Sequence, residues 1–189
     1  MTAKPTARTV FLSHCSGAFV TATLMLFLLA GAAFADMSRF GGTFTGSAEV
    51  TRADGSTIKR DMSVEITERK KGFNVSWTSA TYKSDGRIKE KSYSIDFLPS
   101  DRDGVFAAAM QKNVFGHQVQ LDPMKGEPYV WARIVGDMLT VYSLYVAPNG
   151  GYEIQQFDRT LVDDGLMLDF KVLRNGHTLR TVSTFLARQ

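Results

Sequence analysis

Apolar and polar residues alternate with a period of two through the first part of the chain. In 40–51 the even positions are apolar residues or glycine, and every odd position from Thr43 onward is polar. The segments 58–67 and 73–78 repeat this alternation. Because successive side chains of a β-strand point to opposite faces of a sheet, the pattern predicts strands with one packed face and one solvated face.

The second half of the chain is rich in β-branched and aromatic residues, but its alternation is less distinct. Five segments there have the length and composition of strands: 129–135, 139–146, 152–162, 166–174 and 177–187. Apolar side chains on both faces are typical of a strand buried on both sides, or of a strand that lines an apolar cavity. The intervening part is irregular, and 106–111 fits either a helical turn or a strand.

Glycine-containing turn dipeptides separate these segments, from Asp54-Gly55 to Asn175-Gly176. Several of them suit two-residue hairpin loops, which need positive φ. A long open meander would expose two strand edges, and closure removes them. The sequence therefore predicts an all-β fold, a single antiparallel up-and-down β-barrel of about 8–10 strands, with a two-sheet sandwich as the alternative.

The first 35 residues have the features of a secretory signal peptide. Lys4 and Arg8 form a basic start, 17–33 is an apolar run, and Ala33-Phe34-Ala35 has the small-x-small form of a cleavage site. We expect signal peptidase to cut before Asp36, which leaves one domain, 36–189, without a stable membrane span. We therefore expect a periplasmic or secreted protein.

Removal of that segment changes the charge and the cysteine content. The chain has 22 Lys+Arg and 19 Asp+Glu. Since Lys4 and Arg8 leave with the signal peptide, 22 − 2 = 20 bases remain against 19 acids. This near-neutral, interspersed balance gives no support for a nucleic-acid partner. The only cysteine, Cys15, also leaves, so the mature chain is disulfide-free, as is common in bacterial periplasmic proteins.

Two short motifs at the ends of the expected barrel resemble those of the calycins, the group of lipocalin-like barrels. Gly42-Thr43-Phe44 is similar to the Gly-x-Trp signature of lipocalins, with Phe in place of Trp, and Arg188 stands where an arginine of that family stacks on this aromatic ring. The resemblance implies a barrel that holds a small, mainly apolar molecule.

Few residues indicate catalysis or a cofactor. His177 follows a hairpin turn and should be exposed, whereas His117 alone would be a ligand if the barrel bound haem as nitrobindin-like barrels do. The acidic residues at 101–103 and 163–164 suit turns better than a calcium loop. We expect no metal or other cofactor, and an enzyme is the less expected class.

Aromatic and arginine residues on the expected central strands are the best indication of a binding site. Rings offer contact area at low entropic cost, and an arginine inside a barrel must meet a carboxylate, a carbonyl or the acid group of a ligand. Arg133 and Arg159 could equally point outward with their stems on the surface. Tyr142 and Tyr145 cannot both point inward without a bulge. The candidate ligand-binding residues are Trp77, Trp131, Arg133, Tyr142, Tyr145, Phe157 and Arg159.

The function that we expect is therefore an exported bacterial barrel that binds a small apolar or acidic ligand in its interior. The alternative is a periplasmic protein-interaction module, an inhibitor or an envelope assembly factor, with no ligand. A haem-binding barrel and an enzyme are further alternatives.

Overall fold

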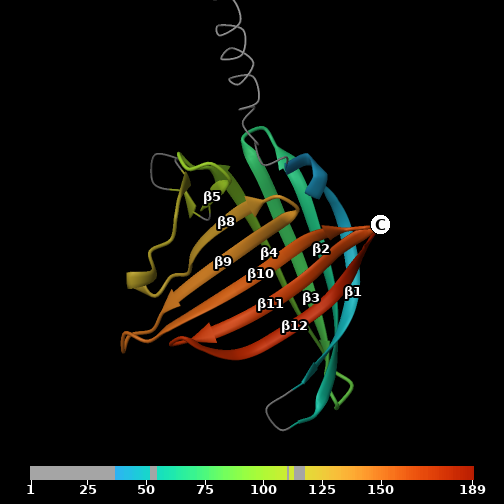
Figure 1. Cartoon of the computed structure of the whole chain (residues 1–189). Helices are drawn as coiled ribbons and strands as arrows, with labels where there is room; N and C mark the ends of the chain where they lie inside the picture. Colours follow the sequence, from blue (N-terminus) through green and yellow to red (C-terminus); the bar gives the residue numbers. More distant parts are fainter. Residues whose placement is uncertain (1–36, 52–54, 110, 113–117) are drawn as a thin grey trace, which may run out of the picture. The chain divides into compact units, whose positions relative to one another are not determined.

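Ten antiparallel strands close into one barrel in the computed structural model, which describes residues 37–51, 55–109, 111–112 and 118–189, without the side chains of 111–112 and 118–119. Each barrel strand pairs with the next barrel strand along the chain, including β5 with β8, and β1 pairs with β12 (Figure 1). The barrel strands are β1 (Gly42–Thr51), β2 (Thr57–Arg69), β3 (Gly72–Tyr82), β4 (Ile88–Pro99), β5 (Val105–Ala109), β8 (Tyr129–Val135), β9 (Met138–Val146), β10 (Tyr152–Val162), β11 (Gly165–Arg174) and β12 (His177–Arg188).

The remaining described elements are short. Strands β6 (Gln111–Lys112) and β7 (Gln118–Val119) pair with each other in a separate two-stranded sheet. Two 3-10 helices are described, η1 (Met37–Phe40) before β1 and η2 (Pro123–Lys125) before β8. No helix among the described residues is long and apolar enough to span a membrane.

The barrel closes where β1 pairs with β12, through Phe44↔Arg188 and Thr45↔Ala187. The Arg188 guanidinium carbon lies 4.6 Å from the centre of the Phe44 ring. Its Nη1 donates a hydrogen bond of 2.6 Å to the Gly41 carbonyl. A side chain at Gly42 would place a Cβ 2.6 Å from this Nη1, so glycine leaves room for the arginine. The first and last strands are thus joined by side chains as well as by the ladder.

Buried apolar side chains fill two regions of the interior. The larger cluster lies around the start of β1 and includes Phe40, Phe44, Phe73 and Phe97, all fully buried. The smaller cluster lies toward the other ends of the β1 and β2 strands and consists of Ala48, Val50, Ile58 and Val182. Met62 contacts both clusters. The inward positions between the two clusters have less apolar packing and surround a cavity.

The closed barrel confirms the predicted fold class and excludes the sandwich. The five strands expected in the second half are present, and 105–109 is a strand and not a helical turn. The expected signal peptide with its cleavage site, Cys15 and His117 lie outside the described residues.

Candidate functional site

An inner cavity of about 330 Å³ lies within the barrel. Its wall comes from β2, β3, β4, β10, β11 and β12, so it is bounded by strands on opposite sides of the barrel. Aromatic rings cross it in a connected series: Tyr93 stacks on Trp77 at 5.1 Å, Trp77 meets Phe157 at 5.7 Å, and Phe157 meets Phe170 at 4.5 Å. Since β3 and β10 are not neighbours in the sheet, the Trp77–Phe157 contact spans the barrel interior.

Arg159 on β10 lines this inner cavity and is the largest fully buried side chain of the described chain, with 1% of its surface exposed. Its guanidinium carbon lies 5.8 Å from the Trp77 ring centre and 5.6 Å from the Phe157 ring centre. Its Nε and Nη1 atoms have no hydrogen-bond partner among the described residues. Two aromatic rings therefore flank a buried cation, and two of its three nitrogens, Nε and Nη1, have no partner among the described residues.

Strand alternation explains why the nearest carboxylate does not pair with Arg159. Asp158 precedes it on β10 and points to the opposite face of the sheet. There the Asp158 carboxylate accepts hydrogen bonds of 2.7 Å from Thr140 Oγ1 and 2.7 Å from Gln156 Nε2. Its charge acts on Arg159 only across the sheet.

The pKa of the Arg159 guanidinium is lowered to about 10 because burial disfavours its charged form, and the charge of Asp158 offsets this only in part. Arg159 still carries its proton at neutral pH. An unpaired buried charge is costly, and an acid group of a ligand would compensate it.

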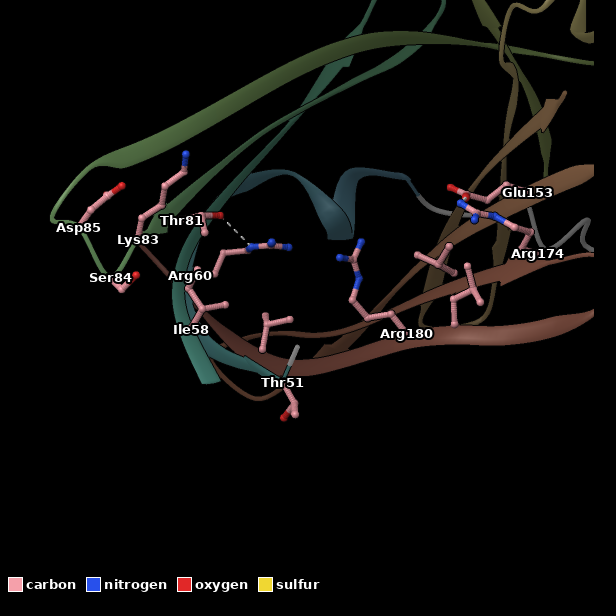
Figure 2. A pocket seen from close by; sticks show the side chains of 13 residues that line it. Thr51, Ile58, Arg60, Thr81, Lys83, Ser84, Asp85, Glu153, Arg174 and Arg180 are labelled. Carbon is pink, nitrogen blue, oxygen red and sulfur yellow. Dashed lines mark hydrogen bonds and ion pairs between the residues drawn. The ribbon is translucent and has the colours of Figure 1, made fainter. Parts of the chain in front are cut away.

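A wider mouth cavity of about 740 Å³ adjoins the inner cavity, and both are lined by Arg60, Thr81 and Arg180. The Arg60 and Arg180 guanidinium groups point toward each other across it (Figure 2). Arg60 Nε donates a hydrogen bond of 3.2 Å to Thr81 Oγ1. The pKa of Arg60 is lowered by partial burial and by the charge of Arg180. Two like charges therefore face each other at the entrance.

The acids of the mouth cavity are already engaged. Glu153 Oε2 lies 2.8 Å from Arg174 Nη2, and Asp85 Oδ2 pairs with Arg87 Nη2. The pKa of Glu153 is lowered by hydrogen bonds from Gln155 and Arg174, with a smaller effect of Arg180. No ion pair joins Arg60 or Arg180 to any residue that the structure describes.

Charge in the inner cavity has one sign. Five of its lining side chains are cationic and none is acidic: Arg60, Lys89, Lys91, Arg159 and Arg180. The bases and acids of 36–189 nearly cancel, so this excess belongs to the cavity wall and not to the whole chain, with Arg159 buried and Lys89, Lys91 and Arg180 exposed. A low-dielectric cavity lined by one sign of charge concentrates the field and attracts anions.

The structure brings together three of the seven candidate ligand-binding residues. Trp77, Phe157 and Arg159 line the inner cavity from β3 and β10. Arg159 points inward, which settles the question of its orientation that the alternation had left open.

The other four candidates lie outside this cavity. The β8 residues Val130 and Ala132 are buried in the core, so Trp131 and Arg133 are on the outer face. Tyr142 stacks on Trp131 at 4.8 Å and 14° and is therefore on the outer face too. Tyr145 shares the inward parity of β9 but is 42% exposed near the end of the strand.

Several lining residues were not identified from the sequence. Arg60, Lys89, Lys91 and Arg180 stand on strands where charged residues also occupy the solvated face. Of these four residues, only Arg60 could have been recognised from the sequence as inward-facing. It alternates with Ile58 and Met62 and therefore falls on the apolar face of its strand.

No other constellation of catalytic type is evident in the described part of the chain. His177 is exposed in its hairpin, as expected. Among the described residues no group of three or more His, Cys, Asp or Glu side chains could hold a metal ion.

Comparison with known proteins identifies no relative by sequence. No protein-family model matches the chain, and no curated protein matches it. One similar solved structure is described as the crystal structure of an N-terminal dehydratase from the difficidin assembly line. It is 9% identical, covers 90% of this chain and 84% of its own, and has a TM-score of 0.21, which is too low to support any functional argument.

Proposed function

We propose that this protein is an exported binding protein that holds a small, mainly apolar molecule with an acid group inside its β-barrel. In this proposal the periplasm or the cell exterior is the place of action. The calycin-like motif of Gly42, Phe44 and Arg188 agrees with a binding role of this kind.

Arg159 is the observation that carries the proposal. The buried Nε and Nη1 of its guanidinium group have no partner among the described residues, and a carboxylate or another oxyanion that enters the inner cavity would stabilise this charge. The Nε and Nη1 donors lie on different edges of the planar guanidinium group, and each can donate a charge-assisted hydrogen bond to a ligand oxygen.

The rest of the inner cavity suits the apolar part of such a ligand. Trp77, Phe157, Phe170, Met62 and Val182 offer rings and aliphatic groups next to the guanidinium. A volume of about 330 Å³ is at the lower end of the range for small-molecule sites, so the enclosed part of the ligand is small.

Isothermal titration calorimetry with decanoate and decanol tests this proposal. The two probes share an alkyl chain and differ in the acid group. We expect decanoate to bind the wild type and Arg159→Met to weaken it roughly 30-fold or more, since removal of one partner of a buried charge pair costs about 2–5 kcal/mol. Decanol should bind both proteins with similar affinity.

Arg133→Met is the matched control, because it removes the same charge from the outer face of β8. It should leave decanoate affinity unchanged. If Arg159→Met and Arg133→Met bind decanoate equally well, Arg159 is not an acid receptor. Native mass spectrometry of protein from its own host would identify the natural ligand, and a bound protein without a small molecule would favour the interaction-module alternative.

A further inference from the structure

We infer that the ligand carries two anionic groups, one held by Arg159 in the inner cavity and the other held between Arg60 and Arg180 at the barrel mouth. This inference rests on the proposed function and adds to it the class of ligand, an elongated dianion with an apolar middle.

The register of the strands gives the order of these groups along the barrel wall. Three alternate β10 residues line the inner cavity, Gln155, Phe157 and Arg159. Across the ladders, Phe157 is level with Phe170 and Val182, and Gln155 is level with Val172 and Arg180.

The wall therefore has a cationic row, an apolar row and a second cationic row. Arg159 and the row of Arg180 are four residues apart on β10, about 13 Å along the strands at 3.3 Å per residue. On the opposite wall, β2 also has its cation, Arg60, at the mouth. The apolar side chains of Met62 and Val64 lie deeper.

The mouth pair has the properties of an anion receptor. Arg60 is oriented by its hydrogen bond to Thr81, and the Arg180 guanidinium carbon lies 5.4 Å from the centre of the Phe170 ring. The pKa of Arg60 is lowered by burial and, to a smaller extent, by repulsion from Arg180. An oxyanion between the two guanidinium groups would convert this repulsion into two charge-assisted contacts.

Within the part of the chain that the structure describes, no acidic side chain is paired with Arg60 or Arg180. Of the acids at the mouth, Glu153 is paired with Arg174 and Asp85 with Arg87. Lys89 and Lys91 on β4 add positive charge to the same wall. A ligand with a single acid that engages Arg159 leaves the mouth pair without an anion when its apolar part fills the row of Phe157 and Phe170.

Matched pairs of monoacid and diacid test the inference by calorimetry: octanoate with octanedioate, decanoate with decanedioate, and tetradecanoate with tetradecanedioate. Each pair has the same carbon chain, so the ratio of the two affinities isolates the second carboxylate. In the wild type we expect at least one diacid to bind about ten-fold tighter than its monoacid, because a hydrogen bond to a charged group contributes about 1.5–3 kcal/mol.

The double variant Arg60→Met/Arg180→Met should abolish the diacid advantage and retain binding of the monoacid. The control Arg133→Met should keep the wild-type ratio. Far-UV circular dichroism of each variant verifies that the barrel is folded before its affinities are compared.

The outcomes separate this inference from the proposed function. Monoacid binding that depends on Arg159, together with equal affinity for the diacid at all three lengths, would overturn the second anion site and keep the first. A diacid advantage that survives in the double variant would also overturn it. Absence of monoacid binding to the wild type would contradict the proposed function itself.

Discussion

Replacement of Arg159 by methionine should make the ligand-free protein more stable. Methionine is unbranched, has a similar length and has no buried donors, so it can occupy the space between Trp77 and Phe157 without an unpaired charge. Arg159 has 1% of its surface exposed and no ion pair with a described residue. The substitution therefore removes the cost of a buried charge and breaks no salt bridge, and contacts of the methionine sulfur with the two rings replace those of the guanidinium group.

The size of the effect follows from the lowered pKa of Arg159. The lowering of the Arg159 pKa to about 10 from the ordinary value of arginine corresponds to about 3 kcal/mol by which burial disfavours the charged form in the folded state. A gain of this size agrees with the range of about 1–4 kcal/mol seen when buried ionic groups are replaced by apolar ones. For a domain of this length it raises Tm by roughly 6–12 °C.

Urea and thermal unfolding of ligand-free wild type and Arg159→Met measure this difference, with Arg133→Met as the control for loss of a surface charge. The sign of the pH dependence adds a second readout. Above about pH 10 the folded state loses its proton at this site before the unfolded state does, so wild-type stability rises with pH and the advantage of the variant shrinks. A loss of 3–5 kcal/mol in Arg159→Met, the cost of breaking a buried pair, would refute the reasoning.

Three further predictions concern other parts of the barrel. Gly42→Ala should lower the free energy of unfolding by about 1–3 kcal/mol, because φ is +139° and the new Cβ would lie 2.6 Å from Arg188 Nη1; Gly86→Ala, at positive φ but with open space, should cost less in the same urea titration. Hydrogen bonds from Ser47 and Tyr82 lower the pKa of the Asp61 carboxyl, so its charged form should stabilise the fold above about pH 4, and this stabilisation should be lost as pH falls through the native pKa. In urea unfolding at acidic pH, Asp61→Asn should lack this pH-dependent part of the free energy of unfolding. Trp77→Leu should weaken decanoate binding by about 1–2 kcal/mol, because the indole lines the inner cavity and leucine offers the alkyl chain less apolar contact, and equal affinity in calorimetry would remove the ring from the site.

The strand content of the barrel could be predicted from local sequence alone. Period-two alternation in β1, β2 and β3 specifies which side chains share a face, and glycine dipeptides specify where the hairpins turn. The long second-half strands were evident from their β-branched and aromatic residues, and the prediction of 8–10 strands agrees with the ten observed. These features depend on neighbours in sequence, so no tertiary information was needed.

The contact between the first and last barrel strands was predicted from a short motif and not from strand alternation. The Gly42 and Phe44 motif suggested the stacking of Arg188, and the structure contains it. The family resemblance behind that suggestion stays a prediction, because one aromatic–arginine contact can arise in any closed barrel whose ends meet.

The facing of the β8 and β9 strands depended on tertiary structure. Trp131 and Tyr142 have the composition expected of a cavity wall, yet Val130 and Ala132 occupy the inner face of β8 and force Trp131 outward. Both faces of these strands carry apolar groups, so alternation gives the two sets of side chains but cannot say which set is buried.

The binding site itself was decided by closure of the sheet. Strand alternation is a local property, so the sequence alone determined that Arg159 and Asp158 point to opposite faces of the sheet. It likewise determined that Arg60 and Met62 share a face. Only the barrel brings β2 and β3 across from β10 and β12, which places Trp77 beside Arg159 and Arg60 opposite Arg180. These contacts join residues that are far apart along the chain. The cavity lined by cations without acids therefore exists only after the strands have closed into the barrel.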